Sequence, residues 1–341
     1  MSFISTKDPQ VLKSIEELVS NFGKDKDPFI SELVTQMIQN SLRLVRDDYN
    51  TGQVKLINNT LKEIRYAYGI FNQYKQTHRI SIFGSARTPE NHPDYLTAKK
   101  FGEKMSAKRW MTITGAAEGI MKAGHEGSTA EESFGLSIRL PFESSSNVII
   151  AGDPKLISFR YFFTRKLMFL SHSHAIAAFP GGFGTQDELF ECLTLMQTGK
   201  ATIIPVVLLE GQEGVYWKFW DTYVKKNFLE HGWISAEDLN FYLLAKNIDE
   251  AVEHVTRFYK RFHSYRYVGD KLVIRIKSRL EDSHIKQLNS DYSKLIASGE
   301  IIQTEALPEE QELKDLPRLV FHHTRKNFGT VRALIDSINN F

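Results

Sequence analysis

The hydrophobic and polar positions of this chain follow two different patterns, and the first covers residues 1–76. Apolar side chains there recur at helical spacing over 11–19, 29–45 and 54–74, without glycine-rich turns. This spacing predicts three helices. We interpret residues 1–76 as a helical N-terminal extension that carries no chemical motif.

From residue 77 onward, short apolar runs alternate with longer amphipathic stretches. The runs predict five strands, at 79–83, 110–114, 134–139, 175–179 and 202–208. The stretches between them predict helices, among them 92–108, 120–131 and 156–170. Alternation of this kind is typical of an α/β fold with a doubly wound, parallel (Rossmann-like) sheet. We assign residues 77–262 to such a domain.

Past residue 262 the pattern changes to a mixture of strands and helices, which predicts a small α+β C-terminal domain over 263–341. The predicted elements are strands at 271–276, 301–304 and 318–322 and helices at 280–298 and 330–338. The acidic stretch 308–317 lies between two of these strands, and we expect it to be a solvated loop. No chemical role follows from this region.

Three glycine-bearing turns follow predicted strands, and they begin at Gly84, Gly115 and Gly181. Because the carboxyl ends of parallel strands lie at one edge of a sheet, the three turns are expected at the same edge. Ligands of doubly wound sheets bind outside that edge, where the strand order reverses. The turns therefore predict one shared site.

The third turn carries the strongest chemical signal. Gly181, Gly182 and Gly184 remove three Cβ atoms within four positions, so backbone N–H groups can approach a ligand closely. Thr185 adds a hydroxyl, and the helix that follows has free N–H donors in its first turn. Such a turn is suited to an anion, and a phosphate is the first candidate. A tight strand-to-helix turn without a ligand explains the glycines equally well.

The predicted helix at 156–170 is rich in aromatic side chains and has little polar surface. A face this apolar favours burial against a second subunit near the site, in a homodimer or a higher homo-oligomer. A central core helix is the alternative.

The composition restricts the partners and the location. The chain has 341 residues, of which 42% are hydrophobic and 25% charged, and a net charge of +2. Neither a nucleic-acid polymer nor an anionic membrane is therefore an expected partner. A single cysteine excludes an internal disulfide, and the N-terminus lacks a signal-peptide pattern, so we expect a cytoplasmic protein.

Metal chemistry finds little support in the residue pattern. His172 and His174 form an H-x-H pair, but no cysteine, aspartate or further histidine completes a ligand cluster. We interpret both histidines as packing residues and Cys192 as a small core residue. We expect neither a metal site nor a cofactor.

Two motifs together resemble the LOG ("Lonely Guy") family of nucleoside-5′-monophosphate phosphoribohydrolases, whose members are often labelled lysine decarboxylases. The family pattern is an Arg-Lys pair on a helix followed by P-G-G-x-G-T-x-E-E. Here the pair is Arg165-Lys166, and the later motif is PGGFGTQDE, with Asp187 in place of the first glutamate. The segments FGSAR and TGAAEGIMKAG are also similar, although G-G-G is more usual where GAA stands. The resemblance covers roughly residues 79–225, and the two extensions resemble those of the longer bacterial members.

The resemblance implies cleavage of the N-glycosidic bond of a nucleoside 5′-monophosphate such as AMP, which gives free base and ribose 5-phosphate. It implies Glu188 and Arg165 as the catalytic residues. The substrate-binding residues would be Gly84, Ser85, Gly115, Lys166, Gly181, Gly182, Gly184 and Thr185. Glu188 would stabilise the positive charge that develops on the ribose, and Arg165 would orient Glu188 and the substrate.

Other functions fit the sequence less well. The first strand is not followed by G-x-G-x-x-G, which argues against a dinucleotide-dependent redox enzyme. Lysine decarboxylation would need a pyridoxal phosphate Schiff-base lysine, whereas Lys166 beside Arg165 is more simply a charged partner for phosphate or carboxylate. A non-catalytic nucleotide-binding or carrier protein with the same phosphate cradle remains the alternative.

Overall fold

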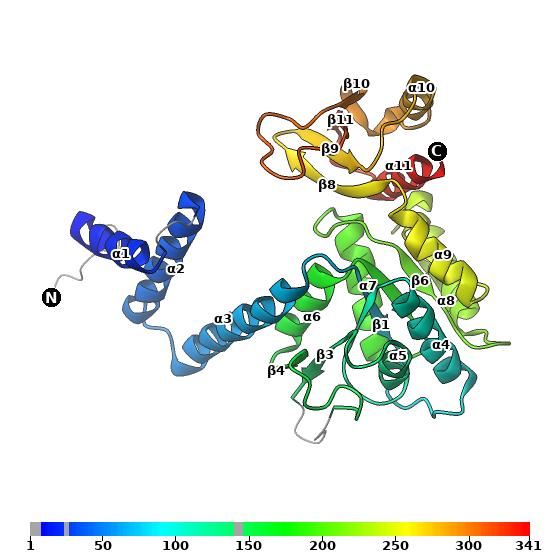
Figure 1. The fold of residues 1–341 in the computed structure, drawn as a ribbon, viewed down its shortest axis with the longest axis horizontal. Helices are drawn as coiled ribbons and strands as arrows, with labels where there is room; N and C mark the ends of the chain where they lie inside the picture. The colour runs from blue at the N-terminus through cyan, green and yellow to red at the C-terminus, as the bar shows by residue number, and fades with distance from the viewer. Residues whose placement is uncertain (1–7, 24–26, 140–145) are drawn as a thin grey trace. The chain divides into compact units, whose positions relative to one another are not determined.

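The computed structural model describes residues 8–23, 27–139 and 146–341, and these residues divide into two compact units at Tyr66 and Ala67 (Figure 1). The first unit contains α1 (Pro9–Phe22), α2 (Pro28–Arg46) and most of α3 (Thr51–Phe71). Asp27 caps α2, because its carboxylate accepts the N–H of Phe29 at 2.9 Å. The helices predicted for the N-terminal extension are confirmed, whereas the compact unit ends at Tyr66 and not at residue 76.

The second unit contains a seven-stranded parallel sheet in the order β4-β3-β2-β1-β5-β6-β7. Its strands are β1 (Arg79–Phe83), β2 (Met111–Thr114), β3 (Ser133–Ile138), β4 (Leu156–Phe159), β5 (Ala175–Ala178), β6 (Val206–Leu208) and β7 (Tyr242–Leu244). Strands β2, β3 and β4 lie in turn on one side of β1, and β5, β6 and β7 lie in turn on the other. The strand order therefore reverses between β1 and β5, which confirms the predicted doubly wound, Rossmann-like fold.

Helices cover both faces of this sheet (Figure 1). They are α4 (Pro93–Ala107), α5 (Ile120–Ser128), α6 (Phe162–His172), α7 (Phe183–Gln197), α8 (Tyr216–Val224) and α9 (Ile248–Phe258). Side chains of β1 alternate between the faces. Ile80 and Ile82 join a core with residues of α4, α5 and α9, whereas Phe83 contacts Phe169 of α6 on the other side. All five residues of β1 are buried, and the hydroxyl of Ser81 is paired with that of Ser173.

Two strands of the sheet were not predicted. The prediction of one helix over 156–170 is wrong for its first part, because Leu156–Phe159 forms β4 and pairs with β3. The helix itself begins at Phe162. It exposes Phe162, Phe163 and Leu167, whereas Phe169 is buried. The second missed strand is β7, which has only three residues.

A four-stranded antiparallel sheet forms the C-terminal part, in the order β10-β11-β9-β8. Its elements are β8 (Phe262–Val268), β9 (Lys271–Ile276), α10 (Asp282–Asp291), β10 (Ile296–Thr304), β11 (Arg318–His323) and α11 (Phe328–Asn340). The predicted small α+β character is confirmed. The helix predicted over 280–298 is wrong at its end, because the chain from Ile296 pairs with β11.

The acidic stretch 308–317 is not simply a solvated loop. Glu310 is 1% exposed, and its carboxylate lies between the buried guanidinium groups of Arg275 and Arg318. Arg275 Nη2 is 2.7 Å from Glu310 Oε1, and Arg318 Nε is 3.0 Å from Oε2. These bonds join the loop to β9 and β11, which explains why one acidic side chain of the stretch is buried.

Three residues with reactive side chains have structural roles. His172 stacks on Phe71 with ring centroids 3.9 Å apart, and His174 accepts the N–H of Arg79 at Nδ1. Burial lowers the pKa of His172 to about 4 and that of His174 to about 3. Cys192 is buried. The packing roles predicted for them are confirmed.

No helix within the described ranges is both long enough and apolar enough to cross a lipid bilayer.

Candidate active site

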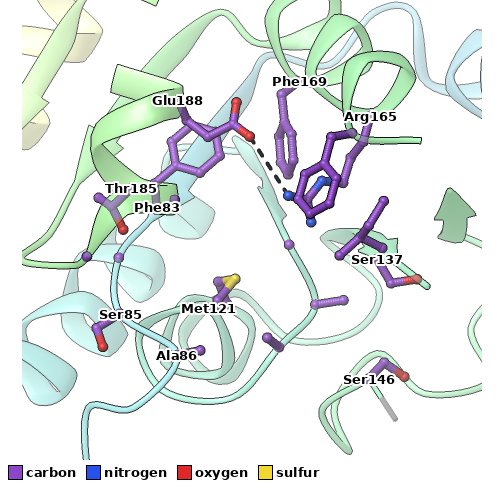
Figure 2. Close-up of a pocket in the computed structure, with 18 of the residues that line it drawn as sticks. Phe83, Ser85, Ala86, Met121, Ser137, Ser146, Arg165, Phe169, Thr185 and Glu188 are labelled. Carbon is purple, nitrogen blue, oxygen red and sulfur yellow. Dashed lines mark ion pairs between the residues drawn. The ribbon is translucent and has the colours of Figure 1, made fainter. Parts of the chain in front are cut away.

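A cavity of about 930 Å³ opens at the carboxyl edge of the sheet, beside the point where the strand order reverses (Figure 2). It contains eight of the ten predicted site residues: Gly84, Ser85, Gly115, Arg165, Gly182, Gly184, Thr185 and Glu188. The three glycine turns therefore meet at one edge of the sheet, as predicted. Gly181 and Lys166 are not among the described residues that line the cavity.

Ser85 connects the three turns through its backbone. Its N–H donates to the carbonyl of Pro180, and its own carbonyl accepts the N–H of Ile120, each at 3.0 Å. Gly119, which precedes α5, has a φ of 63°, and a Cβ there would lie 2.3 Å from the Ser85 carbonyl oxygen. Only glycine allows this close approach without strain. The floor of the cavity is thus one hydrogen-bonded unit.

Gly181 shapes the cavity without lining it. A Cβ at this position would lie 2.2 Å from Thr185 Oγ1, so any larger residue would displace the threonine hydroxyl. By contrast, Gly182 and Gly184 have open space where a Cβ would stand. Gly182 precedes α7, and no side chain caps the helix. The amino end of α7 therefore presents backbone N–H donors and a positive dipole to the cavity.

Glu188 and Arg165 face each other at the top of the cavity, from α7 and α6 respectively (Figure 2). Glu188 Oε1 lies 3.9 Å from Arg165 Nη2, and the two side chains are 7% and 14% exposed. The guanidinium also lies over the rings of Phe162 and Phe169, at 5.1 and 5.8 Å from their centroids. These rings restrict the conformations of Arg165 and keep its charge beside the carboxylate.

Lys166 lies behind Glu188 and not in the cavity. Its Nζ is 2.6 Å from Glu191 Oε2, 2.8 Å from Asp187 Oδ2 and 3.6 Å from Glu188 Oε2. Burial lowers the pKa of Lys166, but hydrogen bonds to Asp187 and Glu191 outweigh it and raise the pKa. Lys166 therefore stays charged and contributes to the electrostatics of Glu188. Asp187, the departure from the family pattern, is one of its two closest partners.

The pKa of Glu188 is raised from 4.5 to about 7. Burial is the main cause, and the positive charges of Lys166 and Arg165 offset only part of it. The carboxylate is thus weakly solvated and titrates near neutral pH. A carboxylate in this condition interacts strongly with a positive charge that develops nearby.

For the reaction that the resemblance implies, cleavage of a nucleoside 5′-monophosphate, we predict that kcat/KM rises with pH through about 7 and levels off above it. The reason is that the ionised form of Glu188 is the one that can stabilise a cation. At pH 5 the rate should be roughly a hundredfold below the plateau. Lys166→Met should move this rise to higher pH, since the lysine charge favours ionisation. Initial rates from pH 5 to 9 test this; a profile that is flat across pH 6 to 8 would contradict the assignment.

A buried polar network supports the second turn, and the sequence analysis missed it. Ala116 has a left-handed φ of 62° where the family more usually has glycine, and its N–H donates to Thr114 Oγ1. His125 lies 3.0 Å from the same hydroxyl through Nε2. Asn147 Nδ2 donates to the Ala117 carbonyl at 2.9 Å and lies 3.2 Å from His125 Nδ1. A lone histidine on a helix gave no signal of this role.

Two further cations line the cavity at its rim. Arg87 follows β1 and Arg139 follows β3, so both stand at carboxyl ends of strands. Both are exposed. Arg87 lies in the turn after a predicted strand and Arg139 is the last residue of one, and these positions were the signal that could have identified them. They add positive charge to a cavity that contains the carboxylate of Glu188.

Within residues 8–23, 27–139 and 146–341, no three His, Cys, Asp or Glu side chains gather closely enough to hold a metal ion.

Comparison with known proteins agrees with this geometry. Residues 113–255 match a family model described as possible lysine decarboxylase. This stretch is therefore similar to the LOG family. The match includes Arg165, Lys166 and the whole third turn, so the resemblance predicted from the motifs is confirmed.

Two named proteins are similar in sequence to this chain. The chain is 28% identical over 183 residues to a probable cytokinin riboside 5′-monophosphate phosphoribohydrolase from Oryza sativa subsp. japonica, which covers 52% of this chain and 76% of the rice protein. It is 27% identical over 146 residues to the pyrimidine/purine nucleotide 5′-monophosphate nucleosidase of Escherichia coli (strain K12). That alignment covers 39% of this chain and 32% of the E. coli protein, so the chain spans about a third of that relative.

Among solved structures, this chain is similar to the molybdenum cofactor carrier protein of Chlamydomonas reinhardtii. The identity is 19%, the TM-score is 0.39, and the match covers 53% of this chain and 98% of the carrier. This likeness concerns the fold alone.

Proposed function

We propose that this protein hydrolyses the N-glycosidic bond of a nucleoside 5′-monophosphate, such as AMP, to free base and ribose 5-phosphate. The observation that carries the proposal is the position of Glu188. Its poorly solvated carboxylate stands beside Arg165, one turn into the helix whose amino end faces the cavity. The names of the rice and E. coli relatives support the same reaction class.

In this proposal the amino end of α7 binds the substrate phosphate. Backbone N–H groups near Gly182 and Gly184 and the hydroxyl of Thr185 act as donors, and the helix dipole favours the negative charge. Glu188 lies on the same helix, so a ribose joined to that phosphate comes within its reach. The phosphate thereby fixes where the sugar stands.

Glu188 then acts on the bond that breaks. Cleavage passes through an oxocarbenium-like state with positive charge on the ribose, and a carboxylate close to that charge stabilises it. The same carboxylate can orient the attacking water. Arg165 positions Glu188 and contacts the substrate, since a guanidinium binds carboxylate or phosphate through two N–H groups. Lys166 acts from behind Glu188 as a fixed charge.

Lysine decarboxylation, despite the description of the matching family, does not fit this cavity. A pyridoxal phosphate enzyme needs a lysine that can form a Schiff base. Among the residues described around the cavity there is no lysine. Lys166 lies outside the cavity and contacts three carboxylates.

The deciding experiment is to incubate the purified protein with AMP, GMP, CMP and UMP in parallel and to measure free base and ribose 5-phosphate. Release from at least one of them is the expected result, and the order of rates would identify the preferred base. Tight binding of a monophosphate without release would instead favour a nucleotide carrier.

Phosphate anchoring gives a separate prediction. Thr185→Ala should raise KM for nucleoside monophosphates about tenfold and change kcat little, because the hydroxyl is one donor among several. Wild-type protein should cleave adenosine much more slowly than AMP, since a nucleoside lacks the anchor. Thr194→Ala, at an exposed position of the same helix, is the matched control. Equal turnover of adenosine and AMP would show that the phosphate lies elsewhere.

Assembly remains a prediction. Beside the cavity, α6 exposes Phe162, Phe163 and Leu167, and Phe183 at the start of α7 is 96% exposed. These apolar side chains form a suitable surface for the homodimer expected from the sequence.

A further inference from the structure

A second cavity of about 670 Å³ lies at the opposite edge of the sheet, where the strands begin. His78 and His174, which directly precede β1 and β5, form part of its wall. The carboxyl ends of α6 and α7, the start of β8 and the segment before β1 supply most of the rest, and Lys277, directly after β9, completes it. All of its residues belong to the second compact unit, and none lines the candidate active site.

Positive charge dominates the polar groups of this cavity. Lys75, Lys200 and Lys277 line it together with three histidines, and no Asp or Glu is among the described residues that do so. Lys75 and Lys200 are exposed, and neither has a carboxylate partner within the described chain. Lys277 Nζ donates to the Tyr259 carbonyl, an uncharged group. The cluster therefore has no internal counter-charge.

Cations at the carboxyl end of a helix can also serve only as hydrogen-bond donors and counter-charges for the free carbonyl groups there. Here that need is already met by other groups. Arg79 Nε donates to the His172 carbonyl at the end of α6, at 2.8 Å. At the end of α7, the Leu195 carbonyl accepts the N–H groups of Lys200 and Ala201, at 2.8 and 3.0 Å. The ammonium groups of Lys75 and Lys200 thus remain available for a ligand.

Two histidines of the cavity, His78 and His263, lie in the positive electrostatic field of this cluster. Burial lowers the pKa of His78 to about 4, and the charges of Lys277, His263 and Arg79 contribute to this shift. The pKa of His263 is also lowered, by burial and then by Lys277. Neither histidine has a carboxylate among the groups that shift its pKa. A bound anion would offset these repulsions.

We propose that this second cavity binds a phosphorylated small molecule of nucleotide size. Lysine ammonium groups act as point charges for phosphate, and three of them surround one space here. The volume falls within the range of small-molecule sites, about 300–1,000 Å³. Leu170, Ile204 and Phe262 provide an apolar wall for the part of the ligand that carries no phosphate. The proposal does not depend on the reaction at the other edge.

Competition labelling tests this site directly, because it reports on individual lysines. The full-length protein is treated with acetic anhydride in the presence of ADP, inorganic pyrophosphate or citrate, and acetylation is measured by mass spectrometry. ADP should slow acetylation of Lys75 and Lys200 several-fold, and pyrophosphate should do so at higher concentration because it lacks apolar contacts. Lys108, which is exposed at the end of α4 and outside both cavities, should be unaffected.

Affinity measurements complete the test. Calorimetric titration of ADP into the protein should show a binding event that weakens about 10–100-fold in the double variant Lys75→Gln/Lys200→Gln and is unchanged in Lys108→Gln; any binding of ADP at the candidate active site should be the same in all three proteins. No protection of Lys75 and Lys200 by either phosphate compound would overturn the proposal. Equal protection by citrate would overturn the phosphate assignment. None of these measurements involves turnover, so they stand or fall separately from the proposed hydrolysis.

Discussion

Glu188→Gln protein is expected to bind nucleoside monophosphates with a nearly unchanged KM and to cleave them about 10²–10⁴-fold more slowly. Glutamine keeps the size of the side chain and most of its hydrogen bonding, but it cannot stabilise a positive charge on the ribose. Single-turnover release of base from AMP, measured beside substrate binding, separates the two effects.

Stability should not account for this loss. The pKa of Glu188 is raised to about 7 in the folded protein, so its protonated form favours folding and that contribution disappears as pH rises through 7. Glutamine resembles the protonated form, and the variant should therefore melt at or above the wild-type temperature at pH 8. Glu191→Gln is the matched control, because Glu191 contacts Lys166 but does not line the cavity. Undiminished turnover by Glu188→Gln would show that the site is misplaced.

Glu310→Gln should lower the free energy of unfolding by about 3–5 kcal/mol, the largest effect on stability that we expect. The substitution removes the carboxylate that Arg275 and Arg318 share, and among the described residues no other carboxylate pairs with these two buried guanidinium groups. Urea unfolding at pH 7 measures the loss. Arg318 is fully buried, so water cannot replace the missing partner without opening the sheet.

Glu309→Gln is the control for this experiment, because the neighbouring glutamate is exposed and should change stability by less than about 0.5 kcal/mol. Burial raises the pKa of Glu310, but hydrogen bonds from Arg318 and Arg275 outweigh it, so the net pKa lies below 4.5. Its contribution to stability is therefore complete above pH 4.5 and is lost as the pH falls below that value. Equal stability of the Glu309→Gln and Glu310→Gln variants would contradict a structural role for the cluster.

The central sheet could be predicted where its pattern was periodic. Strand β1 was predicted at its observed bounds, because Ile80, Ile82 and Phe83 are typical of a strand and a glycine follows directly. Strand β4 was missed because apolar residues continue from Leu156 into α6 without a change of period. Only pairing with β3, which lies far from it in sequence, makes this segment a strand. Three residues are too few to give β7 a pattern of its own.

The candidate site divides in the same way. Glycine turns and the spacing of Arg165 and Glu188 could be read from the chain, since their chemistry is local or part of a motif. The position of Lys166 behind Glu188 could not be predicted, because it depends on how α6 packs beside α7. His125 and Glu310 were also beyond prediction, since burial alone distinguishes each of them from an ordinary surface residue.

The backbone bonds of Ser85 restrict how this fold can change its substrate. One residue inserted into the first or third turn would separate Ser85 from Pro180 or from Ile120, so the length of these loops is fixed. The floor of the cavity is therefore a poor place for variation. The wall supplied by β3 and β4 tolerates variation better. The side chains of Ser137, Arg139 and Ser158 line it, and they can be exchanged without moving the backbone. An engineer who wishes to alter base selectivity should leave the glycines alone and diversify that wall.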